Sequence, residues 1–360
     1  MRKIKVAVIG AGWYAAQSHI PTLARRDDVI LDGVSRLGAD DLARVKERFG
    51  FAFASEDFRA VLARGPEAVI VSSPHGLHYD HAKAALEAGA HVLCEKPMTV
   101  DPAHAWALVD LAARQGRHLL IANGFHYLPG MAELRRKVID GAVGAIEHVS
   151  CHFATPTRKV FAGDEGLPTW KTSFFRPQRS TWQDAAQGGG YAYGQMSHSL
   201  ALMFWFTGLT AESVASRRAP APIDLSNAAS IGFACGAIGV ASGTATAPDL
   251  SRQQLRLYVG GSEGNLTLDV DLDRAEIRRQ DGRHETITVP SGDWNYRCDG
   301  PVDRLIELAQ GRGENLSPGA VGAQAVELIA AMRRSAEAGG APVAVRAAAE
   351  GAGTYKAARA

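Results

Sequence analysis

The chain has 360 residues, which is too long for one ordinary hydrophobic core and therefore predicts two domains. Hydrophobic residues make up 46% and charged residues 21% of the chain, as is typical of soluble globular proteins. Because 39 Lys and Arg balance 38 Asp and Glu to a net charge of +1, charge gives no reason to expect nucleic acid or a membrane surface as a partner.

The four cysteines, Cys94, Cys151, Cys235 and Cys298, lie far apart in the sequence and include no C-x-x-C pair. They are typical of reduced thiols in a cytoplasmic protein rather than of a disulfide framework. No spacing of His, Cys, Asp and Glu suggests a metal site. The sequence has no run of about 18 apolar residues, so we expect no transmembrane helix and a cytoplasmic location.

The first third of the chain alternates between predicted strands and helices. Near-continuous apolar strands separated by helices indicate a parallel sheet that is covered on both faces. We therefore predict an α/β domain with a doubly wound parallel sheet over residues 1–123. Its strands are expected at residues 3–9, 29–35, 51–54, 68–73, 91–94 and 118–122, and its helices within 10–26 and at 40–49, 57–63, 77–88 and 102–115.

From about residue 145 the pattern changes. A long predicted strand at 146–154 precedes an irregular stretch at 155–187 and a helix at 191–206. Residues 235–236 and 281–282, Cys-Gly and Asp-Gly, read as two-residue hairpin turns between strands. These turns predict an antiparallel sheet.

The second domain is therefore predicted to be α+β and to cover residues 124–360. Near its end, Ser317 is expected to cap a helix at 318–338, with Pro318 in the first helical position and Gly339 after the last. We expect this late helix to pack back on the first domain.

A glycine pattern follows the first predicted strand. VAVIGAGWYAA carries Gly10, Gly12 and Ala15 as G-x-G-x-x-A between a strand and a helix, which is the context that a dinucleotide-binding motif requires. Gly10 permits the tight turn, Gly12 lets the backbone approach a pyrophosphate, and Ala15 allows close packing. We predict that this loop, with Trp13 and Tyr14, binds a dinucleotide at the helix N-terminus. A glycine turn without a ligand is the alternative.

The second strand ends in LDGVSR. An NAD site usually places Asp or Glu here for the ribose 2′-hydroxyl, whereas this chain has Ser35 and Arg36. A hydroxyl and a guanidinium suit a 2′-phosphate. We therefore expect NADP or NAD as the cofactor, with NADP favoured. The alternative is that Arg36 is only a solvated loop charge.

A strand that is predicted to be buried ends in a charged pair within VLCEKPM, at residues 92–98. Ligands of such sheets bind outside the carboxyl ends of the strands, so Lys96 can reach a nicotinamide. Pro97 cannot continue the strand and restricts the backbone of Lys96. An ammonium group there can hydrogen-bond a substrate oxygen that gains or loses a proton. A surface lysine is the alternative.

A second candidate site lies on the helix predicted at 191–206. Tyr191, Gly194, Gln195 and His198 fall on one face of it, at spacings of 3, 4 and 7. A neutral imidazole can accept the proton of a hydroxyl while its hydride leaves, so His198 is a candidate acid/base. A structural histidine is the alternative.

Four motifs together resemble the Gfo/Idh/MocA oxidoreductases, a family named for glucose–fructose oxidoreductase, inositol dehydrogenase and a rhizopine-catabolism protein. The motifs are VAVIGAGWYA, SSPHGLH at 72–78, CEKPM at 94–98 and GGGYAYGQMSH at 188–198, and the resemblance covers essentially the whole chain. It implies a Rossmann domain, a second α+β domain with an open, largely antiparallel sheet, and a bound nicotinamide cofactor. It also implies oxidation or reduction of a sugar or cyclitol hydroxyl, and a homodimer or homotetramer built through the second sheet.

The resemblance assigns roles to individual residues. Lys96 matches the catalytic lysine of the family and His198 its active-site histidine. The residues that it implies around the cofactor are Ser73, Pro74, His75, His78, Glu95, Lys96, Pro97 and Asn123.

The chain departs from the family at one position of the site. The family commonly has Asp four residues before the histidine, where this chain has Gly194. A proton relay or a ligand for a substrate hydroxyl is therefore missing. Tyr191, Tyr193 or Gln195 would replace it, or the smaller residue makes room for a larger substrate.

Aromatic and basic residues gather in the irregular stretch, namely Arg158, Lys159, Trp170, Lys171, Arg176, Arg179 and Trp182. In a sugar enzyme, aromatic rings stack on sugar faces and cations hold anionic substituents, so Arg158 and Trp182 are candidates for substrate binding. A surface loop or an oligomer contact is the alternative. His126 and Tyr127, just after Asn123, are further candidates for the substrate pocket.

The sequence therefore predicts an NAD(P)-dependent dehydrogenase of a sugar or cyclitol, in which Lys96 polarises the reacting oxygen and His198 is the acid/base. One alternative is a redox-neutral glycosidase that oxidises a glycoside transiently, eliminates the aglycone and takes the hydride back. The other is a non-catalytic sensor that keeps the cofactor fold. The intact lysine and histidine argue against the sensor.

Overall fold

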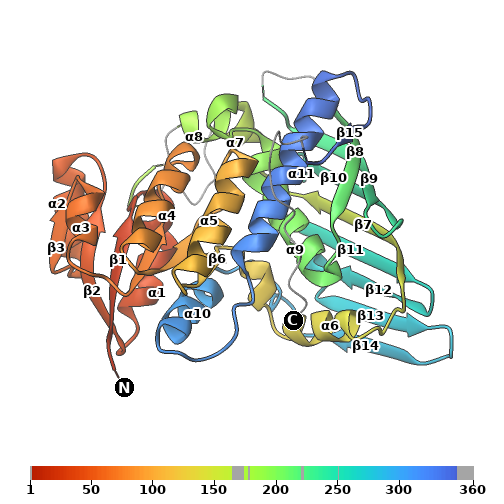
Figure 1. Cartoon of the computed structure of the whole chain (residues 1–360), viewed down its shortest axis with the longest axis horizontal. Helices are drawn as coiled ribbons and strands as arrows, with labels where there is room; N and C mark the ends of the chain where they lie inside the picture. Colours follow the sequence, from red (N-terminus) through yellow and green to blue (C-terminus); the bar gives the residue numbers. More distant parts are fainter. Residues whose placement is uncertain (1, 164–173, 177–178, 220–222, 250, 347–360) are drawn as a thin grey trace.

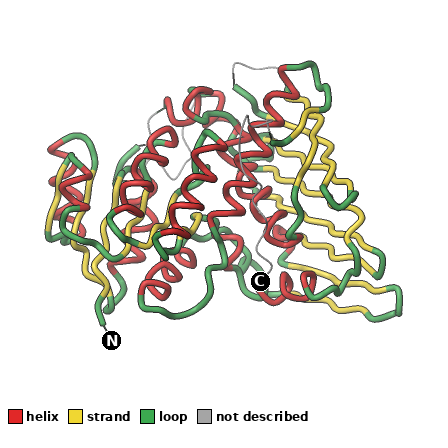
Figure 2. Tube along the Cα trace, viewed as in Figure 1, coloured by secondary structure: helices red, strands yellow, loops and turns green. Residues whose placement is uncertain are grey.

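The computed structural model describes residues 2–163, 174–176, 179–219, 223–249 and 251–346, and two β-sheets dominate it (Figure 1). The strands form two separate groups with helices between them (Figure 2). The N-terminal sheet lies at the left of this view and the second sheet at the right. Helices of one half of the molecule can therefore pack against the other half.

The first sheet has six parallel strands in the described part of the chain, in the order β3-β2-β1-β4-β5-β6. The strand order reverses between β1 and β4, which is where open parallel sheets bind their ligands. Ile9, Val71 and Cys94 are paired across β1, β4 and β5, so the segments after these strands leave the sheet side by side. This arrangement confirms the predicted α/β class. The strands are β1 (Ile4–Ile9), β2 (Val29–Ser35), β3 (Phe53–Ser55), β4 (Ala68–Val71), β5 (His91–Cys94) and β6 (Leu119–Ile121).

Different helices cover the two faces of this sheet. Val6 and Val8 share a buried apolar cluster with residues of α1, α2 and α10, whereas Ala7 and Ile9 share one with residues of α3, α4 and α5. The helix α10 was not predicted from the sequence, although its apolar residues recur at helical spacing. The helical segments of this half are η1 (Ala15–His19), α1 (Ile20–Ala24), α2 (Ala39–Phe49), α3 (Phe58–Leu62), η2 (His75–Leu77), α4 (His78–Glu87), α5 (Pro102–Arg114) and α10 (Asp299–Ala309).

The second sheet has nine strands among the described residues, in the order β14-β13-β12-β11-β7-β10-β9-β8-β15. Hairpins are present at both predicted places, between β9 and β10 and between β13 and β14, but each loop has three residues, 234–236 and 280–282, rather than the predicted two. The sheet is mixed rather than wholly antiparallel, because β7 enters its centre from the first domain and runs parallel to β10. The strands are β7 (Ile146–Ala154), β8 (Ala211–Arg218), β9 (Ser226–Phe233), β10 (Ile238–Thr244), β11 (Gln254–Gly261), β12 (Gly264–Asp269), β13 (Arg274–Arg279), β14 (His284–Thr288) and β15 (Val343–Ala344).

Two long helices, α9 and α11, lie between the sheets (Figure 1). All residues of α9 are buried, and α11 contacts α5 of the first half as well as α9 and β8. The start of α11 corrects the prediction: Pro318 is the N-cap and Ser317 is not, because the backbone at 317–318 is extended and pairs with β6. The other helical segments are η3 (Gly124–Tyr127), α6 (Met131–Ile139), α7 (Arg158–Ala162), α8 (Ser180–Gln183), η5 (Ala185–Gln187), η6 (Ala192–Met196), α9 (Ser197–Thr207), η7 (Val270–Leu272) and α11 (Gly319–Glu337).

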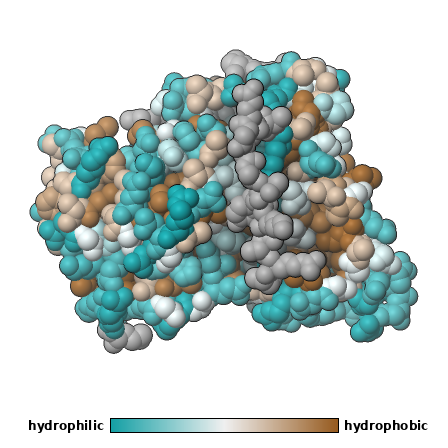
Figure 3. Space-filling view, viewed as in Figure 1, coloured by the Kyte–Doolittle hydropathy of each residue, from teal (hydrophilic) through white to brown (hydrophobic). Residues whose placement is uncertain are grey.

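The second sheet carries apolar side chains at its surface. Ile238 and Val240 of β10 are 63% and 45% exposed, and Tyr258 of β11 is 37% exposed. Figure 3 shows hydrophobic surface at the right of the view, over this sheet. None of the helices in the described ranges has both the length and the apolar character that a membrane span requires.

Candidate active site

Two glycines with different surroundings shape the loop after β1. Gly10 has a φ of +81°, and a Cβ there would lie 2.3 Å from the backbone nitrogen of Ser73, so only glycine fits. At Gly12 a Cβ would meet nothing nearer than the Gly10 carbonyl oxygen at 3.9 Å. Among the residues that the structure describes, none fills the space beside Gly12, and a helix begins directly after the loop at residue 13. This arrangement fits a pyrophosphate held by backbone N–H groups.

The helix after the loop reaches the E-K-P motif. Its turn η1 is π-helical, a distortion that is frequent at functional sites. His19, at the end of this turn, is fully buried and donates from Nε2 to Oε1 of Glu95 at 2.7 Å. Tyr14, which with Trp13 opens the helix, has its hydroxyl hydrogen-bonded to the thiol of Cys298. The cofactor loop and the motif at the end of β5 are thus parts of one buried network.

Glu95 is only 7% exposed, and its second oxygen Oε2 accepts the backbone N–H of Lys96 at 3.1 Å. Burial by itself raises the pKa of Glu95. The hydrogen bond from His19 and the nearby charge of Lys96 outweigh burial, so the pKa of Glu95 is lowered and its side chain is ionised. The charge at the end of this buried strand is therefore held inside the protein.

The side chain of Lys96 crosses to the second half of the molecule. Its Nζ donates to the carbonyl oxygen of Gly194 at 2.9 Å. Burial lowers the pKa of Lys96, and the negative charge of the neighbouring Glu95 partly offsets that effect. The ammonium group of Lys96 therefore lies at the junction of the two halves. Because its pKa is lowered there, it gives up its proton more readily than a lysine in water does.

His198 lies at the same junction. The π-helical turn η6 interrupts the regular helix before it, and there the carbonyl of Gly194 accepts from Lys96. His198 is 5% exposed, its ring lies 4.9 Å from that of Tyr296, and its Nδ1 has no hydrogen-bond partner in the described part of the chain. Burial lowers the pKa of His198 well below its usual range, and Lys96 lowers it further. The imidazole is therefore neutral near pH 7 and able to accept a proton.

Asn123 joins the end of β6 to this histidine. Its Nδ2 donates to the backbone carbonyl of His198 at 3.0 Å. Its Oδ1 is buried and has no hydrogen-bond partner among the residues that the structure describes. A buried carbonyl oxygen without a donor fits the amide of a nicotinamide or a substrate hydroxyl.

The space beside Gly194 is filled rather than open, which corrects the expectation that the glycine makes room for a larger substrate. A Cβ at Gly194 would lie 2.7 Å from Cζ of Phe161. Phe161 is 1% exposed and packs edge-on against Trp182, with ring centroids 5.7 Å apart. An aromatic ring therefore takes the volume that a side chain at position 194 would need.

Replacing Gly194 with alanine is expected to lower the free energy of unfolding by about 1–3 kcal/mol, because the ring of Phe161 would have to move within a packed core. The substitution should also weaken the contact between Lys96 and the carbonyl at position 194. Urea unfolding of Gly194→Ala and of Gly194→Ala/Phe161→Leu checks this. The loss of stability in the double variant should be smaller than the sum of the losses in the two single variants. Strictly additive losses would show that Phe161 is not the obstacle.

Two of the three residues considered as replacements for the missing acid are engaged elsewhere. The Tyr191 hydroxyl donates to the carbonyl of Phe153 at 2.7 Å, and Tyr191 is fully buried. The Tyr193 hydroxyl donates to the carbonyl of Val100 at 3.1 Å. Their protons therefore help to hold the helix in place, and the substrate contacts of both tyrosines stay predictions. Gln195 is half-buried and stays a candidate.

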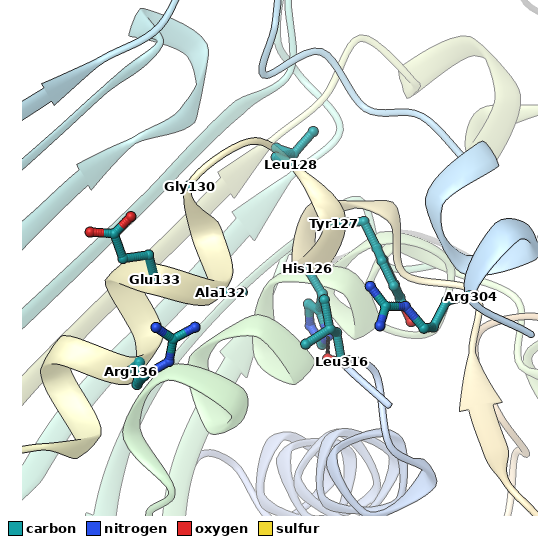
Figure 4. A pocket seen from close by; sticks show the side chains of 9 residues that line it. All are labelled: His126, Tyr127, Leu128, Gly130, Ala132, Glu133, Arg136, Arg304 and Leu316. Carbon is teal, nitrogen blue, oxygen red and sulfur yellow. Dashed lines mark hydrogen bonds between the residues drawn. The ribbon is translucent and has the colours of Figure 1, made fainter. Parts of the chain in front are cut away.

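His126 and Tyr127 line a different cavity, of about 370 Å³, that includes neither Lys96 nor His198 (Figure 4). His126 is fully buried, stacked on Trp205 with ring centroids 4.6 Å apart, and burial lowers its pKa to about 3. The Tyr127 hydroxyl is hydrogen-bonded to that of Ser317 at 2.8 Å. The Nε2 of His126 also lies 3.3 Å from Nδ2 of Asn123, so this ring stays next to the junction, and the substrate contacts of His126 and Tyr127 stay predictions.

The loop after β4 also departs from the prediction at one position. His78 is fully buried, and its ring nitrogens lie 2.8 Å from the carbonyl oxygen of Pro97 and 2.7 Å from that of Ser73. It therefore fastens two loops of the sheet edge together instead of facing a cofactor. Pro74 is exposed beside it, and His75 is buried with its Nδ1 3.3 Å from the carbonyl oxygen of Gly188.

The end of β2 holds Ser35 and Arg36 in different roles. The Ser35 hydroxyl is buried and donates to the carbonyl of Glu56 at 3.2 Å, because β3 lies alongside, and its contact with the cofactor stays a prediction. Arg36 donates to Asp41 at 2.7 Å and lies over the ring of Phe175, 3.9 Å from its centroid. Its Nη1 is 3.4 Å from the carbonyl oxygen of Ala11 in the glycine loop. Arg36 therefore borders the predicted ribose site.

The aromatic and basic stretch is described in part. Arg158 is exposed on α7, and Lys159 pairs with Asp249 at 2.9 Å. Trp182 is half-buried next to His75, with ring centroids 6.0 Å apart, which keeps it near the site. Trp170 and Lys171 lie outside the described residues.

Several side chains at this junction were not predicted from the sequence. His19 and Cys298 contact its polar groups, and Tyr296 donates from its hydroxyl to the carbonyl of Ala122 at 3.1 Å. Burial raises the pKa of Cys298 to about 12, so its thiol is protonated. The sequence does place His19 near the glycine loop, because it lies about two helical turns after Gly12. Residues 296–298 come from the loop before α10, and no local pattern places them here.

Two family models match the chain, and together they cover most of residues 4–267. Residues 4–123 match an oxidoreductase family with an NAD-binding Rossmann fold, and residues 131–267 match the GFO/IDH/MocA C-terminal domain. Fold and site together define a two-domain oxidoreductase of the NAD-binding class. The chain belongs to the Gfo/Idh/MocA family.

Characterised relatives are similar over part of the chain. D-glucoside 3-dehydrogenase of Escherichia coli (strain K12) is 36% identical over 146 residues, 40% of this chain and 41% of that protein. Myo-inositol dehydrogenase Hyg17 of Streptomyces leeuwenhoekii is 31% identical over 144 residues, 39% of this chain and 43% of that protein. The chain thus spans less than half the length of either relative. The structure of levoglucosan dehydrogenase with NADH and levoglucosan has the same fold, with a TM-score of 0.75 at 19% identity over 96% of this chain and all of that one.

Proposed function

We propose that the protein transfers a hydride between a secondary hydroxyl of a sugar, sugar derivative or cyclitol and a nicotinamide cofactor. The observation that carries the proposal is the contact of Lys96 Nζ with the Gly194 carbonyl, one turn before His198. It brings an ammonium and a neutral imidazole together beside the open glycine loop. Similarity to D-glucoside 3-dehydrogenase and myo-inositol dehydrogenase supports the substrate class.

The two side chains divide the proton chemistry between them. Lys96 would exchange the Gly194 carbonyl for the substrate oxygen and stabilise the negative charge that develops there. His198, neutral and buried, would accept the hydroxyl proton during oxidation and return it during reduction. Gly10, Gly12 and Arg36 would hold the dinucleotide, and the nicotinamide, when bound, supplies the site of hydride acceptance.

The test of this function uses oxidised cofactor with panels of free sugars, cyclitols and glycosides. Absorbance of reduced nicotinamide and release of aglycone are followed in the same reactions. Cofactor reduced in step with substrate, and no aglycone, is the expected result. Many aglycones released per cofactor without net reduction would show a redox-neutral glycosidase. Cofactor binding without either reaction, across the whole panel, would show a sensor.

We also propose that NADPH is the preferred cofactor, although NAD-binding is the property of the matched family. Arg36 and Arg44 share a single carboxylate, that of Asp41, at 2.7 Å and 3.1 Å. The two guanidinium groups at this end of the site favour a 2′-phosphate, and the carboxylates of Asp41 and of Glu56, which accepts from the backbone N–H of Gly38, partly offset their charge.

Arg36→Ala is expected to remove most of the preference for NADPH over NADH. A charge-assisted hydrogen bond contributes about 1.5–3 kcal/mol, which corresponds to roughly 10- to 100-fold in affinity. Isothermal titration calorimetry with both reduced cofactors measures the ratio. Asp41→Asn is the matched control, because it frees both guanidinium groups and should increase the preference. Tighter binding of NADH than NADPH to the unaltered protein would exclude this assignment.

For the second sheet we propose contact with another copy of the chain. Ile238 and Val240 on β10 and Tyr258 on β11 expose apolar surface on either side of β7, and apolar patches of this kind favour association. Val240→Glu should lower the molar mass measured by light scattering to that of one chain, 38.3 kDa. Glu147→Gln, a neutralising change on β7, is the control. An unaltered mass in Val240→Glu would place the interface elsewhere.

A further inference from the structure

A continuous set of buried polar contacts joins the dinucleotide-binding helix to Lys96. His19 is fully buried, and its Nε2 donates to Oε1 of Glu95 at 2.7 Å. The other oxygen of Glu95 accepts the backbone N–H of Lys96 at 3.1 Å. Both carboxylate oxygens are therefore engaged, one by each neighbouring element. Lys96 in turn reaches the Gly194 carbonyl at 2.9 Å.

We propose that His19 is a positioning residue that keeps Glu95 ionised and in place beside Lys96, and so keeps Lys96 in its ammonium form and directed at the junction. The proposal rests on the function proposed above, because it concerns the group that would hold the substrate oxygen. It assigns a role to His19 that does not require contact with substrate.

The reason is the cost of a buried charge. A carboxylate this deep in the protein is stable only with hydrogen bonds or opposite charge around it. Without the N–H of His19, Glu95 would keep, among the described residues, only the backbone donor of Lys96, and it would take up a proton or turn away. Lys96 would then lose its nearest negative charge, and burial would favour the uncharged amine.

Other titratable groups face this pair, and none of them replaces His19. Cys298 and Tyr14 are buried, and burial raises the pKa of each, so both stay neutral. His198 and His75 are neutral because burial lowers their pKa well below the usual range. The groups that face Lys96 or Glu95 from the surrounding elements are Tyr14 and His19 before α1, His75 and His78 after β4, His198 on α9, and Tyr296 and Cys298 before α10.

The test is a titration of Lys96 in the cofactor-free protein. Lysine is labelled with ¹³C at Cε, and the Lys96 resonance is identified by its loss in Lys96→Met. The midpoint for Lys96 is expected to fall by about one pH unit or more in His19→Leu, because the ammonium loses the Glu95 charge. Glu95→Gln should produce the same fall. The Lys96 midpoint in the double variant His19→Leu/Glu95→Gln should be no lower than in Glu95→Gln, because both substitutions remove the same interaction.

A matched control separates this role from ordinary packing. Arg64 donates to both oxygens of the buried Asp32, at 2.9 Å each, on the second strand. Arg64→Gln also leaves a buried carboxylate without its partner, and should lower stability while leaving the Lys96 midpoint unchanged. His19→Gln, which keeps an N–H donor, should restore part of the shift.

An unchanged Lys96 midpoint in His19→Leu would overturn the proposal, as would additive shifts in the double variant. If His19→Leu does not fold, the comparison of Glu95→Gln with the unaltered protein still decides whether the Glu95 charge sets the midpoint. The readout needs neither cofactor nor turnover. If the unaltered protein oxidises no sugar but the Lys96 midpoint shifts in His19→Leu, only the proposed function is contradicted. If the unaltered protein oxidises a sugar but the midpoint does not shift, only the role of His19 is contradicted.

Discussion

Replacing Lys96 with methionine is expected to lower kcat by about 10³-fold or more, while the affinity for the nicotinamide cofactor changes little. Methionine keeps the length and apolar stem of the side chain and removes the ammonium that contacts the Gly194 carbonyl at 2.9 Å. The loss is confined to the transition state, because the charge on the substrate oxygen develops only there. Steady-state kinetics with the substrate found in the panel, and fluorescence titration with the reduced cofactor, measure the two quantities separately.

The control for this variant is Lys83→Met. Lys83 lies on the surface of α4, where it pairs with Glu87 at 3.2 Å, and it is 46% exposed. It should keep full activity. If Lys96→Met retained near-normal turnover, Lys96 would have no part in the chemistry. If it lost cofactor affinity to the same degree as kcat, Lys96 would be a binding residue instead.

Replacing His198 with asparagine is expected to lower kcat for oxidation by about 10²–10⁴-fold, the range for loss of a general base. The pH dependence of kcat provides a second, independent test of the role of His198. Burial lowers the pKa of His198 well below its usual range. The imidazole therefore stays neutral as the pH falls through 6.5, and the rate of oxidation should decline only at lower pH. The asparagine variant should lose this acidic limb.

Profiles of kcat against pH for both proteins check the assignment, with thermal unfolding at each pH to exclude loss of the fold. His104→Asn is the control, because His104 is an exposed residue of α5 stacked on Tyr79, with ring centroids 3.9 Å apart. Its profile should match that of the unaltered protein. An acidic limb centred near pH 6.5 in the unaltered protein would mean that the reacting base is a solvated histidine and not His198.

Local patterns in the sequence were sufficient for the first half of the fold. The alternation of apolar strands and helices specified a parallel sheet, because strands buried on both faces must be apolar throughout. The glycine loop was readable for a similar reason. Only glycine has room at position 10, where a Cβ would lie 2.3 Å from the backbone of Ser73. Lys96 followed from the rule that parallel sheets bind ligands at the carboxyl ends of their strands.

The tertiary structure decided what surrounds those residues. The resemblance of 188–198 to the family pointed to His198 and to the missing acid at Gly194, but not to Phe161, which comes from another element and fills the space. Tyr191 and Tyr193 are on the predicted helix, yet their hydroxyls bond to carbonyls of distant segments. A helix pattern fixes spacing along the chain but not which side chain faces which neighbour.

The same limit explains the contacts around Lys96. The residues that His19, Glu95 and Cys298 contact are remote from them in the sequence. The largest separation is 284 residues, between Tyr14 and Cys298. α10, which delivers Cys298, packs on the first sheet although it comes late in the sequence. By itself the sequence determined where the dinucleotide loop, Lys96 and His198 would be. Their ionisation and their neighbours were decided only by the folded chain, because burial and charge act through space between residues that are remote in the sequence.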